Sequence, residues 1–202
     1  MTKKIIKKAI RDLLKTFSEY PDIFLTENDV CCYLFAILIK SSLSSLRPQK
    51  TRDASFSIPI HSGIRWYGSS GKLRYLSDIV LLKPKDLRVK DRSSLRLPSR
   101  LPSRLPSKGY GFNSYYGIIE IKLRRVNGYS NNEFLKRIEK DVIKLKNIRE
   151  ETKIYNKIKK PIYCLVCLDK KHDIRNDIEK IVSSIIRPEE NIFFKYIFNK
   201  SK

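Results

Sequence analysis

The chain has 202 residues, enough to bury a sizeable core within one domain without support from disulfide bonds. Its 43 Lys and Arg residues outnumber 21 Asp and Glu residues, which gives a formal net charge of +22. This excess is larger than solubility requires and predicts attraction to a polyanion, with nucleic acid as the leading candidate. An acidic membrane would also attract this charge, but the basic N-terminal segment has the pattern of an ordinary surface helix, so no membrane partner is expected.

The start of the sequence and its cysteines both indicate an intracellular protein. No long apolar segment followed by small-residue cleavage positions occurs there, so a secreted protein is not expected. The apolar run CCYLFAILI has about half the length that a bilayer span needs. Cys164 and Cys167 lie inside the strand-like run PIYCLVCL, where they would face opposite sides, so buried reduced thiols are favoured over a zinc site. We therefore expect a cytoplasmic protein.

Two helices are predicted at the beginning of the chain. Apolar residues recur at helical spacing over residues 3–19, with basic residues on the other side, and a turn at Pro21 ends this pattern. Thr26 followed three residues later by Asp29 is a capping-box pattern that predicts the start of a second helix. That helix continues to about Ser42, and because its middle is almost wholly apolar we expect it to be central.

Three strands and an insertion are predicted next. The strand candidates are residues 55–67, 73–82 and 115–123, and GSSGK supplies hairpin-turn residues between the first two. An insertion at about 86–112 contains LPSRLPSRLPSK, in which proline at every fourth position excludes both helix and central strand. We expect the insertion to be an extended, disordered basic loop.

The remaining pattern alternates helices and strands. A third helix is predicted over about 132–152, then a short buried strand in IYCLVCL, an amphipathic helix in DIRNDIEKIVSSII, and a last strand in NIFFKYIF. The order α-α-β-β-β-α-β-α-β predicts an α/β protein of the α+β mixed-sheet kind, with a central mixed sheet flanked by helices. A single domain covering residues 1–202 accommodates all these elements.

Two of the predicted strands carry charged residues among apolar ones. Asp78 lies in YLSDIVLL, and Glu120 and Lys122 lie in IIEIKL. Glu120 and Lys122 are two residues apart, so they share one face of their strand. Charged groups at such positions cost free energy unless a partner or a metal holds them. If the two strands pair as antiparallel neighbours, Asp78 joins Glu120 and Lys122 on one face.

This set of groups suits Mg²⁺ or Mn²⁺. Both ions accept carboxylate oxygens, keep several waters and bridge to phosphate oxygens, and a lysine beside the metal-bound water can orient or deprotonate the nucleophile. The alternative for the same residues is a cross-strand ion pair on a solvated sheet face.

The arrangement resembles the PD-(D/E)xK nuclease superfamily, which has the restriction-endonuclease-like fold. The matching residues are Ser77-Asp78 on the second strand, Glu120-Ile121-Lys122 on the third, and Glu27 on a helix ahead of the sheet. The order of elements agrees over about residues 22–170. Serine replaces the motif's proline at position 77, and the long gap from Asp78 to Glu120 is explained by the insertion.

The resemblance implies a role for each matching residue. Asp78 and Glu120 would bind the metal, the backbone carbonyl of Ile121 would complete its shell, and Lys122 would position the attacking water. Glu27 would assist or hold a second ion. The alternative for Glu27 is an acid favoured in a first helical turn by the helix dipole.

Basic residues on the third predicted helix and in the insertion are candidates for contacts to nucleic-acid phosphates. They are Lys136, Arg137, Lys140 and Lys144 on the helix, and Arg96, Arg100 and Arg104 in the insertion. A solvated helix face and a hairpin extension that grew by repeat slippage are the alternatives. Phosphate contacts carry no sequence information, so they do not predict a preferred sequence.

The sequence therefore predicts a Mg²⁺-dependent endo- or exodeoxyribonuclease that hydrolyses phosphodiester bonds, with DNA favoured over RNA. The resemblance also allows a homodimer. Two other functions are kept open: a non-catalytic, basic nucleic-acid-binding protein on the same fold, and a basic RNA-associated structural protein in which Glu120 and Lys122 form only an ion pair.

Overall fold

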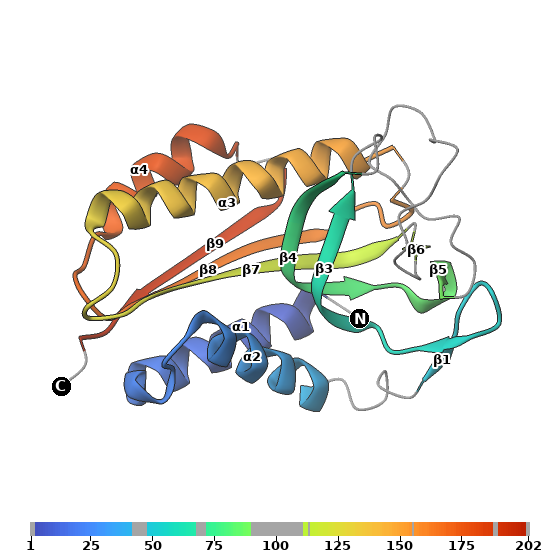
Figure 1. Ribbon diagram of the computed structural model, residues 1–202, viewed down its shortest axis with the longest axis horizontal. Helices are drawn as coiled ribbons and strands as arrows, with labels where there is room; N and C mark the ends of the chain where they lie inside the picture. Colours follow the sequence, from blue (N-terminus) through green and yellow to red (C-terminus); the bar gives the residue numbers. More distant parts are fainter. Residues whose placement is uncertain are drawn as a thin grey trace.

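The protein is described here from a computed structural model covering residues 3–41, 48–67, 72–89, 111–112, 114–154, 156–187 and 190–200. It has three layers (Figure 1): a twisted β-sheet, one helix pair on one face and a second helix pair on the other. The helices are α1 (Lys3–Glu19), α2 (Glu27–Ser41), α3 (Asn131–Thr152) and α4 (Arg175–Ile185). The main strands are β3 (Ile60–Tyr67), β4 (Leu73–Leu82), β7 (Tyr115–Arg124), β8 (Ile162–Asp169) and β9 (Ile192–Phe198).

The main sheet is mixed. Its strand order is β3-β4-β7-β8-β9; β3, β4 and β7 pair antiparallel, whereas β7, β8 and β9 pair parallel. Parallel neighbours require a crossover connection, and α3 and α4 are the helices in these two crossovers. The predicted element order and the mixed α/β class are confirmed, and the architecture is consistent with a restriction-endonuclease-like fold.

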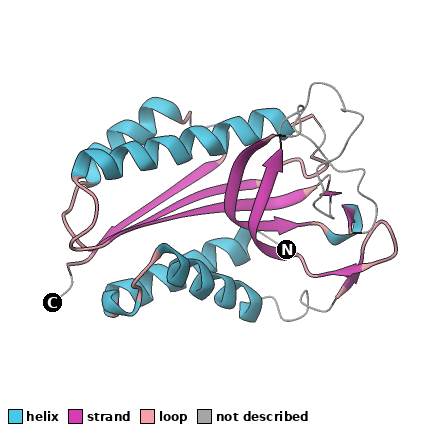
Figure 2. Ribbon diagram, in the orientation of Figure 1, coloured by secondary structure: helices cyan, strands magenta, loops and turns pink. Residues whose placement is uncertain are grey.

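Figure 2 shows the sheet between two layers of helices, and alternating side chains of the sheet form an apolar core with each layer. On β7, Ile119 and Ile121 pack in the core with α1 and α2, whereas Ile118 packs in the core with α3 and α4. Cys164 and Cys167 on β8 also divide between the two cores, and both are free thiols, as their spacing predicts. Glu120 and Lys122 have the parity of Ile118, so their side chains extend toward α3.

The predicted cap of α2 is confirmed. The backbone N–H of Asp29 donates to the Thr26 hydroxyl at 3.1 Å, and the backbone N–H of Thr26 donates to the Asp29 carboxylate at 2.8 Å. This reciprocal pair satisfies two backbone donors that the helix itself leaves without partners. The cap fixes where α2 begins, and therefore where Glu27 stands relative to the sheet.

The predicted strand at 55–67 is interrupted. Pro59, which has no N–H to donate, separates β2 (Phe56–Ser57) from β3, and β2 pairs instead with β1 (Gln49–Lys50) in a separate two-stranded ribbon. Residues 68–71, which form most of the expected hairpin turn GSSGK, lie outside the described residues. The antiparallel pairing of β3 with β4 that this turn predicts is present.

The expected insertion at 86–112 begins and ends in a short antiparallel ribbon, β5 (Leu87–Arg88) with β6 (Gly111–Phe112). Residues 90–110 lie outside the described residues, and they include Arg96, Arg100 and Arg104. Among the helices that the structure describes, none combines the length and apolar character needed to cross a membrane.

Candidate active site

The candidate site lies where β4 and β7 part. Their pairing runs from Leu82–Tyr115 to Ile79–Ile119. At the next position a side chain replaces the backbone ladder: the Asp78 carboxylate accepts a hydrogen bond from the backbone N–H of Ile121 at 2.7 Å. The Asp78 side chain is thus fixed at the point where the two strands separate.

Glu120 is completely buried beside this point. One carboxylate oxygen accepts a hydrogen bond from Lys144 Nζ at 2.6 Å, and the other, Oε1, has no hydrogen-bond partner among the described residues. The pKa of Glu120 is raised to about 8. Burial is the main cause, the nearby Asp78 and Asp141 carboxylates add to it, and Lys144 opposes it. A buried carboxylate with one unsatisfied oxygen is costly unless another group joins it.

Lys122 extends into the same region. Its Nζ lies 2.8 Å from Asp141 Oδ2 and 3.5 Å from Glu27 Oε2, and it donates to the Ile121 carbonyl at 2.9 Å. Burial alone would lower the pKa of Lys122, but Asp141 and Glu27 outweigh burial and raise it above its usual value. Lys122 is therefore an ammonium ion at neutral pH.

Glu27 reaches the site from the opposite helix layer. It is the first residue of α2, and its side chain is 38% exposed. Four residues along the same helix, Cys31 Sγ contacts the backbone carbonyl of Asp78 at 3.7 Å. The beginning of α2 is therefore attached to β4 beside the site, which brings Glu27 within reach of Lys122.

Asp141 on α3 is a site residue that the sequence reasoning missed. Its carboxylate lies 2.8 Å from Lys122 Nζ and 3.1 Å from Lys144 Nζ, and the residue is 7% exposed. A signal was present in the sequence, because Ile138, Asp141 and Leu145 follow the spacing of one helix face. An acid in an apolar stripe indicates an inward-facing charge, just as Asp78 and Glu120 do in their strands.

Lys144 has a different position from the one expected of a phosphate contact. Its side chain is 14% exposed, and it donates to Glu120 at 2.6 Å and to the Leu76 carbonyl at 3.1 Å. It thus binds inside the site and satisfies a β4 carbonyl where the strands part. Lys136, Arg137 and Lys140, by contrast, are exposed on α3.

A cleft of about 600 Å³ opens beside these groups, between α3 and the first half of β4. Its lining residues are Arg74, Tyr75, Leu76, Lys122, Arg137, Lys140, Asp141, Ile143, Lys144 and Asn147. Five of them are basic and one is acidic. Three of the basic residues already have carboxylate partners: Arg74 pairs with Glu151, and Lys122 and Lys144 pair with acids of the site. Arg137 and Lys140 form no ion pair among the described residues, so these two supply the positive charge that attracts anions to the cleft.

The donor set has the chemistry of a divalent-cation site. Four carboxylates and two ammonium groups are grouped here: Glu27, Asp78, Glu120 and Asp141 with Lys122 and Lys144. With all six groups ionised, two negative charges remain, the charge that one divalent cation neutralises. The unsatisfied Oε1 of Glu120 and the all-oxygen donors suit Mg²⁺ or Mn²⁺, which need only one or two carboxylates plus waters.

The carboxylates are separated by lysines rather than clustered. Within the described ranges, no group of three or more His, Cys, Asp or Glu side chains is close enough to hold a metal ion as it stands. Lys144 lies between Glu120 and Asp141, and Lys122 lies between Asp141 and Glu27. The two ammonium groups therefore supply the positive charge that the carboxylates require.

Comparison with known proteins adds one finding. No protein-family model matches the sequence, and no curated protein matches it. A solved structure of NucC from E. coli MS115-1 in its cAAA-bound form is similar, with 10% sequence identity and a TM-score of 0.39, over 94% of this chain and 72% of that chain. At these values the likeness carries no weight for function, and the site rests on the residues of this chain.

Proposed function

We propose that the protein is a metal-dependent nuclease that hydrolyses phosphodiester bonds, with DNA as the favoured substrate. The observation that carries this proposal is the meeting of Asp78, Glu120 and Lys122 where β4 and β7 part, directly beside a basic cleft. Nucleic-acid phosphates are the polyanion that such a cleft and a net charge of +22 favour.

In this proposal Asp78 and Glu120 hold the metal ion, with the Ile121 carbonyl as a further oxygen. A bound Mg²⁺ or Mn²⁺ supplies Lewis-acid polarisation of the phosphate and lowers the pKa of a water molecule. Lys144 has two acidic partners, Glu120 at 2.6 Å and Asp141 at 3.1 Å. It can therefore release Glu120 and stay paired with Asp141.

Lys122 is the positioning group for the attacking water. Because carboxylates keep it protonated, it acts as a hydrogen-bond donor and a positive charge, not as the base. Its two acidic partners hold the ammonium group from opposite layers, Asp141 from α3 and Glu27 from α2. Glu27 is 38% exposed, so it can also face a second cation at the edge of the site.

The cleft binds the phosphate backbone beside the site. Arg137 and Lys140 line it, together with Arg74, which is paired with Glu151 at 2.8 Å. Arg137 stacks over the Tyr129 ring at 3.7 Å, which orders the guanidinium without neutralising its charge. Such contacts position a strand and carry no sequence preference.

The proposal is tested by cleavage of labelled duplex, branched and single-stranded DNA and of RNA, with Mg²⁺, with Mn²⁺ and with a chelator. Wild type is compared with Asp78→Asn and Lys122→Met, and with Asp12→Asn on α1 as a control that removes the same charge away from the site. We expect metal-dependent cleavage that falls about 100-fold or more in both site variants, since each removes an interaction with the reacting groups. The control should cleave as wild type does.

Three results would contradict this proposal. Cleavage that survives in both site variants would assign the activity to other residues. No cleavage of any substrate, together with salt-sensitive DNA binding in all four proteins, would instead favour the non-catalytic binder. Preference for structured RNA without dependence on divalent metal would favour the RNA-associated structural protein.

A further inference from the structure

A second cavity lies where α3 ends and β8 begins. It has a volume of about 640 Å³ and is lined by Lys3, Arg149, Lys153, Asn156, Ile158, Lys159, Lys160, Pro161, Tyr163, Glu190 and Asn191. Five of these residues are basic and one is acidic. None of them belongs to the candidate active site.

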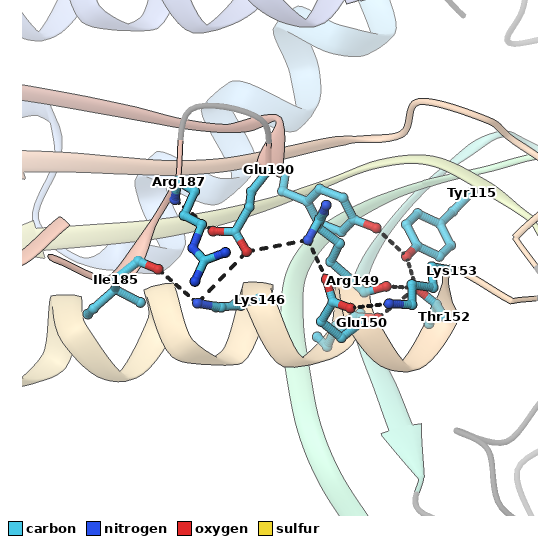
Figure 3. Close-up of polar contacts among 11 residues, drawn as sticks. Tyr115, Lys146, Arg149, Glu150, Thr152, Lys153, Ile185, Arg187 and Glu190 are labelled. Carbon is cyan, nitrogen blue, oxygen red and sulfur yellow. Dashed lines mark hydrogen bonds and ion pairs between the residues drawn. The ribbon is translucent and has the colours of Figure 1, made fainter. Parts of the chain in front are cut away.

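The acidic residues near this cavity already have partners. Figure 3 shows Arg149 between Glu190 and Glu150; Arg149 lies 3.4 Å from Glu190 and also pairs with Glu150. Lys146 lies 3.8 Å from Glu190, and Lys153 lies 2.6 Å from Glu150. Glu150 and Glu190 therefore pair with three basic side chains, and they do not neutralise the other basic residues that line the cavity.

Three lysines of the rim remain without an acidic partner in the described part of the chain. Lys159 and Lys160 are exposed and form no ion pair there, and Lys3 donates only to the neutral Asn191 side chain, at 3.0 Å. Like charges gathered around a concave surface repel one another unless an anion joins them. This part of the cavity therefore favours a ligand with more than one negative charge.

The wall of the cavity is rigid and partly apolar. Thr152 donates to the Ile148 carbonyl at 2.6 Å, Tyr115 bonds to Thr152, and Tyr163 bonds to Tyr115 at 2.8 Å, part of which Figure 3 shows. Because the one Thr152 proton is used, Tyr115 donates to Thr152 and Tyr163 donates to Tyr115. This chain of buried hydroxyl groups holds Tyr163, which lines the cavity, in place.

The cavity is separate from the active-site cleft. Lys144 lines the cleft and Lys153 lines the cavity. Lys153 directly follows the last residue of α3 and keeps a helical backbone conformation, nine positions after Lys144. Nine positions are a rotation of about 180° at 3.6 residues per turn, so the two residues lie on opposite sides of the helix. A strand bound in the cleft therefore leaves the second cavity open.

We propose that this cavity binds the phosphate groups of a nucleotide-sized anion. Its volume is in the range of small-molecule sites, about 300–1,000 Å³, and is far larger than one phosphate needs. Lys3, Lys159 and Lys160 neutralise the phosphates, while Ile158 and Pro161 pack against the apolar part of the ligand. The ligand is either a free nucleotide or the phosphorylated end of a nucleic-acid strand, which share this chemistry.

Calorimetric titration of the full chain in chelator-containing buffer tests the proposal without requiring cleavage. The probes are ATP, pyrophosphate and a short 5′-phosphorylated single-stranded oligonucleotide. Wild type is compared with the double variant Lys159→Gln/Lys160→Gln. The matched control is Lys4→Gln/Lys8→Gln, which removes the same charge from exposed positions of α1. Because all four lysines are exposed, both double variants should fold, as circular dichroism would verify.

We expect ATP or the oligonucleotide to bind wild type and to bind the cavity variant about tenfold or more weakly, with less than about a twofold change in the control. Loss that affects ATP identifies a free nucleotide as the ligand, and loss confined to the oligonucleotide identifies a strand end. If both double variants bind the probes equally more weakly than wild type, the loss of net charge explains the effect, and the proposal is overturned. Wild type that binds no probe at millimolar concentration would also overturn it.

Discussion

Two buried ion pairs lie four residues apart on β7, both on the side of α3, and they differ in how completely their atoms are satisfied. Arg124 pairs with Asp169, and both side chains are 0% exposed. Glu120 pairs with Lys144, and the exposed fractions are 0% and 14%. Burial alone does not distinguish the two pairs. The difference lies in the hydrogen-bond partners that surround each pair.

In the Arg124–Asp169 pair, which we call the closed pair, the charged groups have many hydrogen-bond partners. Arg124 binds both Asp169 oxygens, at 2.9 Å and 2.5 Å, and also donates to Asn131 at 2.6 Å. Asp169 accepts further bonds from the backbone N–H of Lys171 and from the hydroxyl of Tyr196. With this many partners, the pair can repay its desolvation cost and hold the ends of β7 and β8 together.

In the Glu120–Lys144 pair, which we call the open pair, the hydrogen-bond partners are incomplete. One Glu120 oxygen has no hydrogen-bond partner among the described residues, Lys144 is shared with Asp141, and a cleft lies alongside. Nothing in the apolar core requires this arrangement, which raises the pKa of Glu120 to about 8. The comparison indicates that incomplete satisfaction, rather than burial, separates a site for chemistry from a structural pair.

The largest expected change in the free energy of unfolding follows from breaking the closed pair. Arg124→Met leaves a buried Asp169 without its counter-ion, and should lower the free energy of unfolding by about 3–5 kcal/mol. Urea titration followed by circular dichroism measures this. The double variant Arg124→Met/Asp169→Leu should recover much of the loss, because no charge stays buried. A single-variant loss below about 1 kcal/mol would show that the network is not structural.

The next largest change is expected in the pH dependence of stability, which tests the open pair. The folded-state pKa of Glu120 is raised to about 8 from a usual value of 4.5, so wild type should lose stability as pH rises between these values. Glu120→Gln cannot titrate, and Lys144 keeps Asp141 as its partner. In metal-free buffer we expect this variant to exceed wild type in stability by about 1–3 kcal/mol at pH 8.5 and by less at pH 5. Parallel stability curves for the two proteins would contradict this.

A smaller effect tests whether a metal ion can replace an ammonium group. Lys144→Met removes one of the two positive charges among the carboxylates, so saturating Mg²⁺ should stabilise this variant by about 1 kcal/mol more than it stabilises wild type. Thermal melts with and without Mg²⁺ measure the difference. Lys146→Met, two residues along α3 and paired with Glu190, is the control. An equal response in both variants would argue against cation binding at the carboxylates.

The smallest effect is expected at the rim of the cleft. Arg137→Gln should weaken duplex DNA binding about two- to threefold and reduce the slope of log K against log salt by about one, because one exposed phosphate contact is lost. Fluorescence anisotropy at several salt concentrations would measure both. Lys180→Gln on α4 removes the same charge elsewhere. If both variants reduce the slope equally, the cleft is not the binding surface.

Much of the fold was predictable from local pattern. The helical period over residues 3–19 and the capping box of Thr26 with Asp29 place α1 and α2 within a residue or two. Local pattern did not show that Pro59 ends the strand ladder, so the strand predicted at 55–67 was too long. Such a break depends on which neighbour the strand pairs with, and pairing partners are non-local.

The sequence alone determined that Glu120 and Lys122 share one face of their strand, since period-2 geometry leaves little freedom. It predicted that Asp78 joins them if the two strands pair antiparallel, and the structure has that pairing. Only the tertiary structure decided that Asp141 and Lys144 complete the cluster. The apolar stripe of α3 indicates that Asp141 faces inward, but it does not show which charged groups Asp141 meets, and Lys144 by itself equally suits a solvated face. The partners of both residues depend on how the crossover helix packs on the sheet.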